Sequence, residues 1–291
     1  MDFLHPYGNL DVLWRYGKVA PYLQNFLWTK EVASKIVGKD FILLERGTKN
    51  PPLYIKDFEV IDEDFLQLRA NNHLKDVNNK LTEKQILLRK YFVPRKLADF
   101  FYATNHEYGK TMDRIFIDID RQDNNAADAQ KTARELVKTL QTDKALPAII
   151  KFKILILWTG SSFHLLLILG KPVDHATYDR YFSYGPHKSE SFITARANQV
   201  SKQTWLTVLA GHERKRGALI LDSSNTPPGK LGRCPFSLHI KDAKTIDGIA
   251  VPVTLQELGD KKLISRLQSL TPETIRKEIK KYSKIIESSQ R

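Results

Sequence analysis

The most regular alternation of apolar and polar residues lies just after residue 113. From Ile115 to Asp120, three isoleucines alternate with Phe116, Asp118 and Asp120. This period of two predicts a β-strand with the isoleucines on one face and both aspartates on the other. Small and apolar residues then recur at three- and four-residue spacings, which predicts a helix over residues 126–141.

The segments that follow predict a mixed α/β (α+β) fold. Two apolar strands, 148–158 and 163–169, flank the turn Thr159-Gly160-Ser161-Ser162, which is typical of a β-hairpin. We expect a helix over 192–209, short strands at 218–221 and 236–240, and a last helix with Thr271 as N-cap and Pro272 in its first turn.

The N-terminal third mixes helix-like and strand-like segments and ends in polar sequence. Residues 41–46 predict a strand that stops at Gly47, and an Asn- and Lys-rich stretch runs from Asn71 to Lys84. We therefore expect an N-terminal module at 1–95, a catalytic core at 96–260 and a C-terminal helical tail at 261–291, within the size of one large domain.

Composition narrows the classes of partner. The chain has 46 Lys and Arg against 33 Asp and Glu, a surplus that attracts polyanions such as nucleic acid, although charge alone fits a protein that binds none. The single cysteine, Cys234, excludes an internal disulfide framework and a multi-cysteine zinc site. No apolar run approaches the roughly 18–20 residues that span a bilayer. We expect no membrane association, and a location in the cytoplasm with the nucleoid, or in a nucleus.

Asp118 and Asp120 are candidate metal ligands. Carboxylates two residues apart on a strand lie about 6–7 Å apart along one face, a spacing that can bracket two divalent ions about 3.5–4 Å apart. Asp-x-Asp alone is also found in sugar transferases and aspartyl phosphatases, and two solvated aspartates often end a strand. In aspartyl phosphatases the strand that carries the nucleophile normally continues with Thr or Val and Gly, whereas here Asp120 precedes Arg121-Gln122-Asp123.

Two later segments carry groups suited to phosphate. Ser162 and His164 directly follow the glycine-containing turn, where a hydroxyl, an imidazole and backbone N–H groups can meet phosphate oxygens. Asp222 ends a predicted strand and is a candidate third acid. Beyond it, Arg233 and His239 are candidate polyphosphate contacts, and Lys241 shares the strand face of His239; the alternative is an ordinary turn and edge strand.

Taken together, these segments resemble the archaeo-eukaryotic primase superfamily. Asp-Ile-Asp at 118–120, Ser-Phe-His at 162–164, Asp222 and the segment Arg-Cys-Pro-Phe-Ser-Leu-His-Ile-Lys at 233–241 occur in the order of that family's motifs. The match runs from about residue 113 to 253. A shorter similarity, around Val-Ala-Pro-Tyr-Leu at 19–23, is to the polymerase domain of bacterial end-joining ligases.

The resemblance implies a primase-polymerase, a DNA-directed nucleotidyltransferase; the sequence leaves open whether it serves DNA replication, DNA repair or a mobile element. It implies that Asp118, Asp120 and Asp222 bind two Mg²⁺ or Mn²⁺ ions, and that nucleoside triphosphate is contacted by Ser162, His164, Arg233, His239 and Lys241. It also implies a mostly antiparallel core sheet that presents the three acids on one face. DNA template and primer strand are the implied macromolecular partners, with a partner subunit, ligase or helicase beside them.

A non-catalytic, polymerase-like subunit that binds nucleic acid remains the alternative from a different class. Aromatic and basic residues interleave from Tyr178 to Lys188, and a basic run extends from His212 to Arg216. Such segments suit a single-strand or primer–template groove, and equally a solvated loop packed by its own tyrosines.

Overall fold

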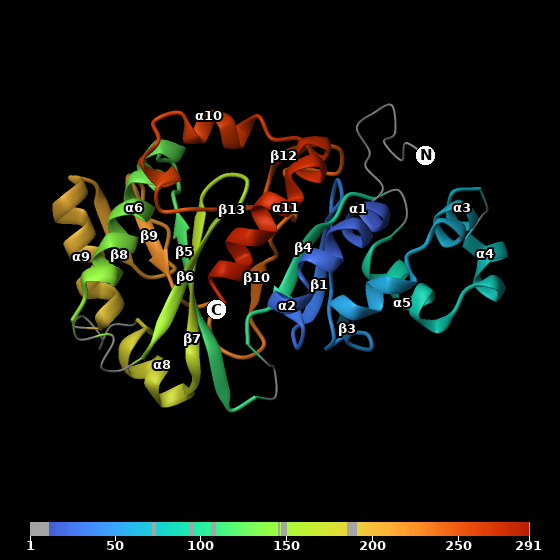
Figure 1. Ribbon diagram of the computed structural model, residues 1–291, viewed down its shortest axis with the longest axis horizontal. Helices are drawn as coiled ribbons and strands as arrows, with labels where there is room; N and C mark the ends of the chain where they lie inside the picture. The colour runs from blue at the N-terminus through green and yellow to red at the C-terminus, as the bar shows by residue number, and fades with distance from the viewer. Residues whose placement is uncertain are drawn as a thin grey trace.

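Two β-sheets lie side by side in the computed structural model, which describes residues 12–71, 74–93, 96–105, 109–144, 146, 150–184 and 191–290. The larger, six-stranded sheet occupies the left half of Figure 1 and has the order β13-β6-β7-β5-β9-β8. Its neighbours are antiparallel except for the parallel pair β8–β9. Its strands are β5 (Thr111–Asp120), β6 (Phe152–Trp158), β7 (Phe163–Asp174), β8 (Thr207–Ala210), β9 (Ala218–Asp222) and β13 (Val251–Val253).

Helices cover one face of the six-stranded sheet. The apolar stripe of α6 (Ala126–Thr142) packs on the isoleucine face of β5, where Ile115, Ile117 and Ile119 have no solvent exposure. The helix α9 (Phe192–Thr204) packs beside α6, and α11 (Pro272–Ser288) contacts β13. The remaining elements here are α8 (His175–Tyr181), η4 (Glu257–Gly259) and α10 (Leu263–Gln268). The aspartates of β5 therefore point away from α6.

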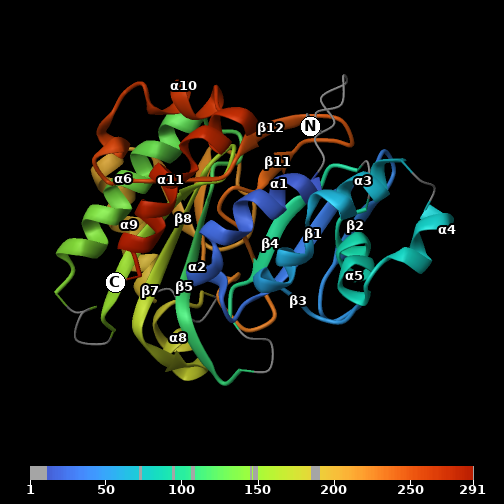
Figure 2. The same ribbon diagram turned by 45° about the vertical axis from the view of Figure 1, so that its right-hand side comes forward.

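The second sheet combines segments distant in the sequence. It has the order β10-β4-β1-β2, with β3 also paired to β1 (Figure 2). The strands are β1 (Glu31–Val37), β2 (Ile42–Glu45), β3 (Leu53–Tyr54), β4 (Asp99–Ala103) and β10 (Leu231–Arg233). The helices beside it are α1 (Val12–Val19), η1 (Ala20–Tyr22), α2 (Gln24–Leu27), η2 (Ile55–Val60), α3 (Glu63–Asn71), α4 (Leu74–Val77), η3 (Asn78–Lys80) and α5 (Glu83–Tyr91).

This sheet contains strands from both sides of residue 95, where the sequence predicts a domain boundary. That boundary remains a prediction. A short hairpin of β11 (Leu238–Ile240) and β12 (Ile246–Ile249) completes the architecture. Within the described residues, no helix combines the length and the apolar character needed to cross a membrane.

The mixed α/β class and the mostly antiparallel sheets are confirmed. The helix predicted over 192–209 is wrong in its last third: α9 ends at Thr204, Trp205 turns the chain with φ 60°, and β8 follows because Thr207–Ala210 pair with β9. The strand predicted from residue 236 begins at Leu238. Phe236 has φ 68° and donates its N–H to the carbonyl of Ala250 at 2.7 Å, which bends the chain before the strand.

Candidate active site

The three predicted acids meet on the sheet face opposite α6. Asp118 on β5 is the register partner of His164 on β7 and of Asp222 on β9. Directly opposed residues of antiparallel strands project to the same face with Cβ atoms about 4.5–5.5 Å apart. The His164 Nε2 atom lies 3.3 Å from Asp118 Oδ1. Asp120 follows two residues later on the same face, so β7, β5 and β9 present one row of ionisable groups.

A pocket of about 370 Å³ opens beside this row. It lies between the two sheets: the acids come from β5, whereas β4 and β10 of the five-stranded sheet supply the opposite wall. The pocket brings together six of the eight predicted site residues. Its lining is Phe101, Phe116, Asp118, Asp120, Arg121, Gln122, Thr159, Ser161, Ser162, His164, Asn225, Leu231, Arg233 and His239.

Asp222 stands in the row but does not line the pocket. Its Oδ1 accepts hydrogen bonds from the Tyr184 hydroxyl at 2.9 Å and from the Ser224 N–H at 2.7 Å. Burial raises the pKa of the Tyr184 phenol, so this hydroxyl remains a donor at neutral pH. The Tyr184 ring in turn packs against His212 of the β8–β9 loop, with centroids 5.4 Å apart.

The β6–β7 turn is fastened to the end of β5. Ser162 donates its hydroxyl to the carbonyl of Ile119, and the Thr159 N–H donates to the Ser162 carbonyl at 2.9 Å. Arg121, directly after Asp120, donates from Nε to the Ser161 carbonyl at 3.0 Å. These bonds fix Ser162 beside the aspartates, and they use its hydroxyl hydrogen within the protein.

His239 reaches the pocket because two glycines allow close backbone packing. A Cβ on Gly248 would lie 2.4 Å from the Cα of Gly160, and Gly160 has φ +105°. The β11–β12 hairpin therefore lies directly on the β6–β7 turn. The Asp247 carboxylate contacts His239 Nδ1, which leaves Nε2 directed at the Ser161 hydroxyl, 3.5 Å away.

Arg233 is held by groups of the five-stranded sheet. Its Nη1 lies 3.2 Å from Oδ1 of Asp99, which has no solvent exposure, and donates to the Leu238 carbonyl at 2.7 Å. Its guanidinium also stacks on Phe101, 5.0 Å from the ring centroid. Lys35 contacts the other Asp99 oxygen at 3.0 Å. Arg233 thus presents positive charge to the pocket from a fixed position.

Several groups of the site go beyond the residues that the sequence predicts. Arg121 follows the Asp-x-Asp pair directly, a position that could have indicated it. Asp99, Tyr184 and Asp247 are separated from their partners by long stretches of sequence or by a turn, and no local pattern marks them. Lys241 is exposed and outside the pocket lining. His187 and Lys188 of the aromatic–basic segment lie outside the described residues.

The donor set matches the chemistry of Mg²⁺ or Mn²⁺, which prefer carboxylate oxygens. Asp118, Asp120 and Asp222 provide such oxygens on one face. Within the described ranges, however, no three His, Cys, Asp or Glu side chains are grouped closely enough to hold a metal ion. Asp222 Oδ1 accepts the hydrogen bond from Tyr184, and Asp118 Oδ1 lies beside His164 Nε2.

The two sheets meet over a row of aspartates, and a Ser-x-His hairpin and an arginine-bearing strand lie around that row. This arrangement is a primase-polymerase fold. The chain matches no sequence-family model, and no curated protein matches it in sequence. Among solved structures it is similar to the polymerase domain of Mycobacterium tuberculosis Ligase D, determined in complex with DNA. The match covers 99% of this chain and 95% of that one, with a TM-score of 0.63 and 14% identity. The resemblance inferred from the sequence is thus confirmed at the level of the fold.

Proposed function

We propose that this protein is a DNA-directed nucleotidyltransferase that extends or initiates a nucleic-acid strand from nucleoside triphosphates. The observation that carries the proposal is the row His164–Asp118–Asp222 across three adjacent strands, with Asp120 beside it. Acidic groups for metal and basic groups for phosphate face one pocket between two sheets. A DNA template and a primer strand are the partners that this chemistry requires.

The protein's own side chains divide into two sets. His164, His239 and Arg233 surround the pocket as donors for the triphosphate, and the Ser162 turn offers further polar contacts. Asp118, Asp120 and Asp222 would hold two divalent ions, whose chemistry supplies charge stabilisation at the attacking and leaving oxygens. Binding of these ions requires Asp222 to offer an oxygen other than the one shared by Tyr184 and Ser224.

The reaction is attack by a primer or initiating 3′-hydroxyl on the α-phosphate, which forms a phosphodiester bond and releases pyrophosphate. Phosphoryl-type transfers of this kind depend on positioning and on electrostatic stabilisation rather than on covalent chemistry by the protein. The fixed attachments of Arg233 to Asp99 and of His239 to Asp247 suit that requirement, because preorganised donors need little reorganisation energy during the reaction.

Substitution of Asp118 tests the proposal. Asp118→Asn keeps the shape of the side chain, which contacts His164 at the pocket rather than in the core, so the fold should persist. We expect primer extension with Mg²⁺ or Mn²⁺ to fall by at least about 10²–10³-fold. Asp242→Asn, an exposed acid in the β11–β12 loop, is the matched control and should extend normally. An Asp118→Asn protein with near wild-type extension and an unchanged circular dichroism spectrum would refute the assignment.

A second candidate is a non-catalytic subunit that binds nucleic acid beside a partner subunit, ligase or helicase. The engagement of Asp222 by Tyr184 and Ser224 favours it, since the third acid is not oriented into the pocket. The two functions separate when the wild-type protein is given a primed template, each nucleotide class and a divalent ion. Binding without any metal-dependent incorporation would select the non-catalytic role.

A further inference from the structure

Trp205 is an exposed aromatic side chain held in an unusual backbone conformation. Its side chain is 92% exposed, although large aromatic residues are rarely left in water. It caps α9 with φ 60° and ψ 23°, the left-handed region that disfavours bulky residues. Its N–H donates to the Ser201 carbonyl at 2.9 Å, and Ser201 donates its hydroxyl to the Leu206 carbonyl, so hydrogen bonds on both sides fix the turn.

Basic side chains gather around this tryptophan. Lys131 on α6 donates from Nζ to the carbonyl of Thr204 at 2.6 Å, which places an ammonium one residue from Trp205. Lys202 is exposed in the last turn of α9. Gln130 donates to the Asp260 carbonyl at 2.8 Å and so joins α6 to the segment that carries Lys261. We name Trp205, Lys202 and Lys131 the Trp205 patch.

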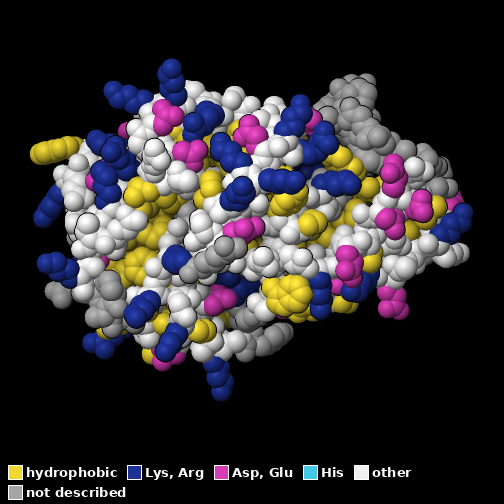
Figure 3. Space-filling model, viewed as in Figure 1, with side chains coloured by type: hydrophobic (Ala, Val, Ile, Leu, Met, Phe, Trp, Pro, Cys, Tyr) yellow, Lys and Arg dark blue, Asp and Glu magenta, His cyan; other side chains and the backbone are white. Residues whose placement is uncertain are grey.

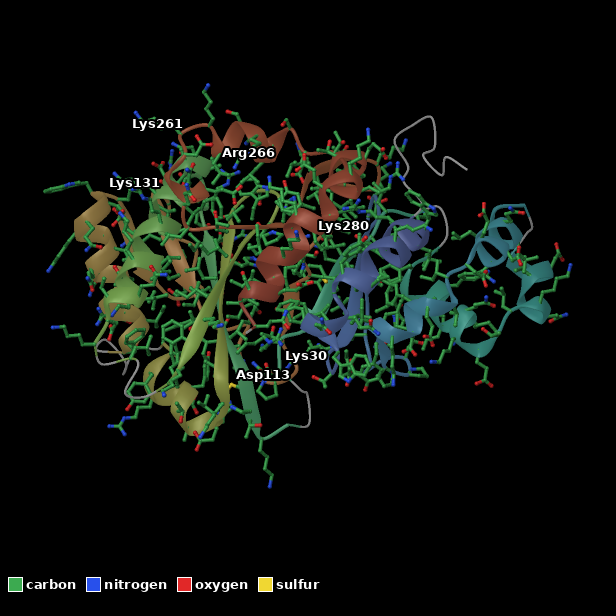
Figure 4. The ribbon with its side chains drawn as sticks, in the orientation of Figure 1. Lys30, Asp113, Lys131, Lys261, Arg266 and Lys280 are labelled. Carbon is green, nitrogen blue, oxygen red and sulfur yellow. The ribbon has the colours of Figure 1, made fainter. Side chains whose placement is uncertain are left out.

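Figures 3 and 4 show further cations on elements next to α6. Lys131 and Lys261 lie close together at one end of the near face in Figure 4. Figure 3, in the same view, shows Lys and Arg side chains gathered over α10 and α11 on that face.

The few nearby acids do not cancel this charge. The chain has no Asp or Glu from Ser191 to His212. Asp260 is 3.4 Å from Arg266, which also contacts Glu257 at 3.1 Å. Asp128 stands one turn before Lys131 on α6 and is the acid closest to the patch in sequence on that helix. The patch therefore carries a surplus of positive charge beside a free aromatic face.

The patch lies beyond the end of the catalytic strand. Asp120 pairs with Ile220, which pairs with Leu209, and Trp205 stands four residues before Leu209. With standard strand rise and spacing, Trp205 is roughly 15 Å from Asp120. Arg121, directly after Asp120, lines the pocket, and Arg216, whose side chain is 97% exposed, lies 3.8 Å from Asp123.

We propose that the Trp205 patch binds the unpaired part of the template strand, with a base stacked on the indole and phosphates on the lysines. The proposal rests on the proposed function and names a second contact for its nucleic-acid partner. Stacking on an aromatic ring is available to an unpaired base but not to bases inside a duplex, and flanking cations track the backbone.

The test compares two labelled DNA ligands by fluorescence anisotropy, without nucleotide or divalent metal: a primer–template with a long single-stranded 5′ overhang, and the blunt duplex. Trp205→Gly removes the ring and relaxes the positive φ, so folding is not at risk. We expect it to weaken overhang binding about 5- to 150-fold, the range of one aromatic–base stack. Blunt-duplex binding should stay within about 2-fold, because the duplex offers no unpaired base to the ring.

Controls separate stacking from charge and from general surface effects. Trp205→Phe retains a ring and should restore most of the overhang affinity. Trp28→Ala removes another exposed tryptophan, at 58% exposure just before β1, and should bind as the wild type does. Lys131 and Lys202 are also replaced together by Ala. The plot of log affinity against log salt concentration should then become less steep, by about 0.7 for each phosphate that the variant no longer neutralises.

Each outcome decides the matter. If Trp205→Gly binds the overhang as Trp28→Ala does, or weakens equally toward both ligands, the patch does not hold unpaired template and its charge serves another partner, such as an acidic protein. Failure of the proposed function is distinguishable. A protein that never extends a primer, yet binds the overhang through Trp205, retains the patch and refutes only the catalytic role.

Discussion

Asp99 is a fully buried carboxylate whose replacement we expect to weaken both the fold and nucleotide binding. Asn at this position keeps the size of the side chain and an oxygen for the Ile240 N–H, which donates to Oδ1 at 3.0 Å, but it removes the charge. The Lys35 side chain is 31% exposed and can turn to water, whereas that of Arg233 is 9% exposed. Leaving one member of a buried ion pair without its partner costs about 3–5 kcal/mol.

Urea denaturation of Asp99→Asn, Arg233→Met and the double variant measures this coupling. We expect Asp99→Asn to lower the free energy of unfolding by about 3–5 kcal/mol when Arg233 is present, and by less than about 1 kcal/mol when Met replaces it. Binding of a fluorescent nucleoside triphosphate to folded Asp99→Asn should also weaken, because Arg233 loses its anchor. A decrease of the same size in both backgrounds would show that Asp99 does not act through Arg233, and the reasoning would fail.

Two further predictions concern metal affinity and pH. Tyr184→Phe removes the hydroxyl that holds Asp222 outside the pocket lining, and a hydrogen bond to a charged group contributes about 1.5–3 kcal/mol, so Mn²⁺ titration followed by electron paramagnetic resonance should show binding that is tighter by about 10-fold. Unchanged Mn²⁺ affinity would remove Tyr184 from the site. Burial, then the charge of Arg114, lowers the pKa of Lys30 from 10.5 to about 8. Between pH 8 and pH 10.5 the unfolded chain binds more protons than the folded chain, so stability rises with pH. From pH 7 to pH 9.5, the free energy of unfolding of the wild type should rise by about 2 kcal/mol more than that of Lys30→Met. A difference between the two proteins that does not change with pH would contradict the lowered pKa.

Local periodicity predicted the elements that bear the acids. The alternation from Ile115 to Asp120 indicated a strand and the faces of its side chains, and the turn at 159–162 indicated a hairpin, because both signals lie within a few residues. Strand order is non-local, so periodicity could not show that β9 lies beside β5 or that β10 joins a sheet begun at β1. The family resemblance supplied the common face of the three acids.

The second layer of the site escaped prediction for the same reason. Asp99 and Arg233 are far apart in sequence and meet only because β10 pairs with β4. Tyr184 reaches Asp222 from the far end of a helix and loop, and its hydrogen bond turns that acid from the pocket. Propensity also failed at Trp205, where hydrogen bonds around the left-handed turn and pairing with β9 end the helix early.

The pairing of β10 with β4 has a consequence for synthesis of the chain on the ribosome. The sheet that anchors Arg233 begins at β1 and is completed only by residues 231–233, and the hairpin with His239 follows later still. Contacts of such sequence separation form after most of the chain has emerged. The pocket wall with Arg233 and His239 therefore cannot assemble on a nascent chain that ends before about residue 250, even when the strand with Asp118 and Asp120 has already emerged. Under the proposed function, nucleotide can stabilise only the nearly finished protein, so the N-terminal third must persist until then without support from that ligand.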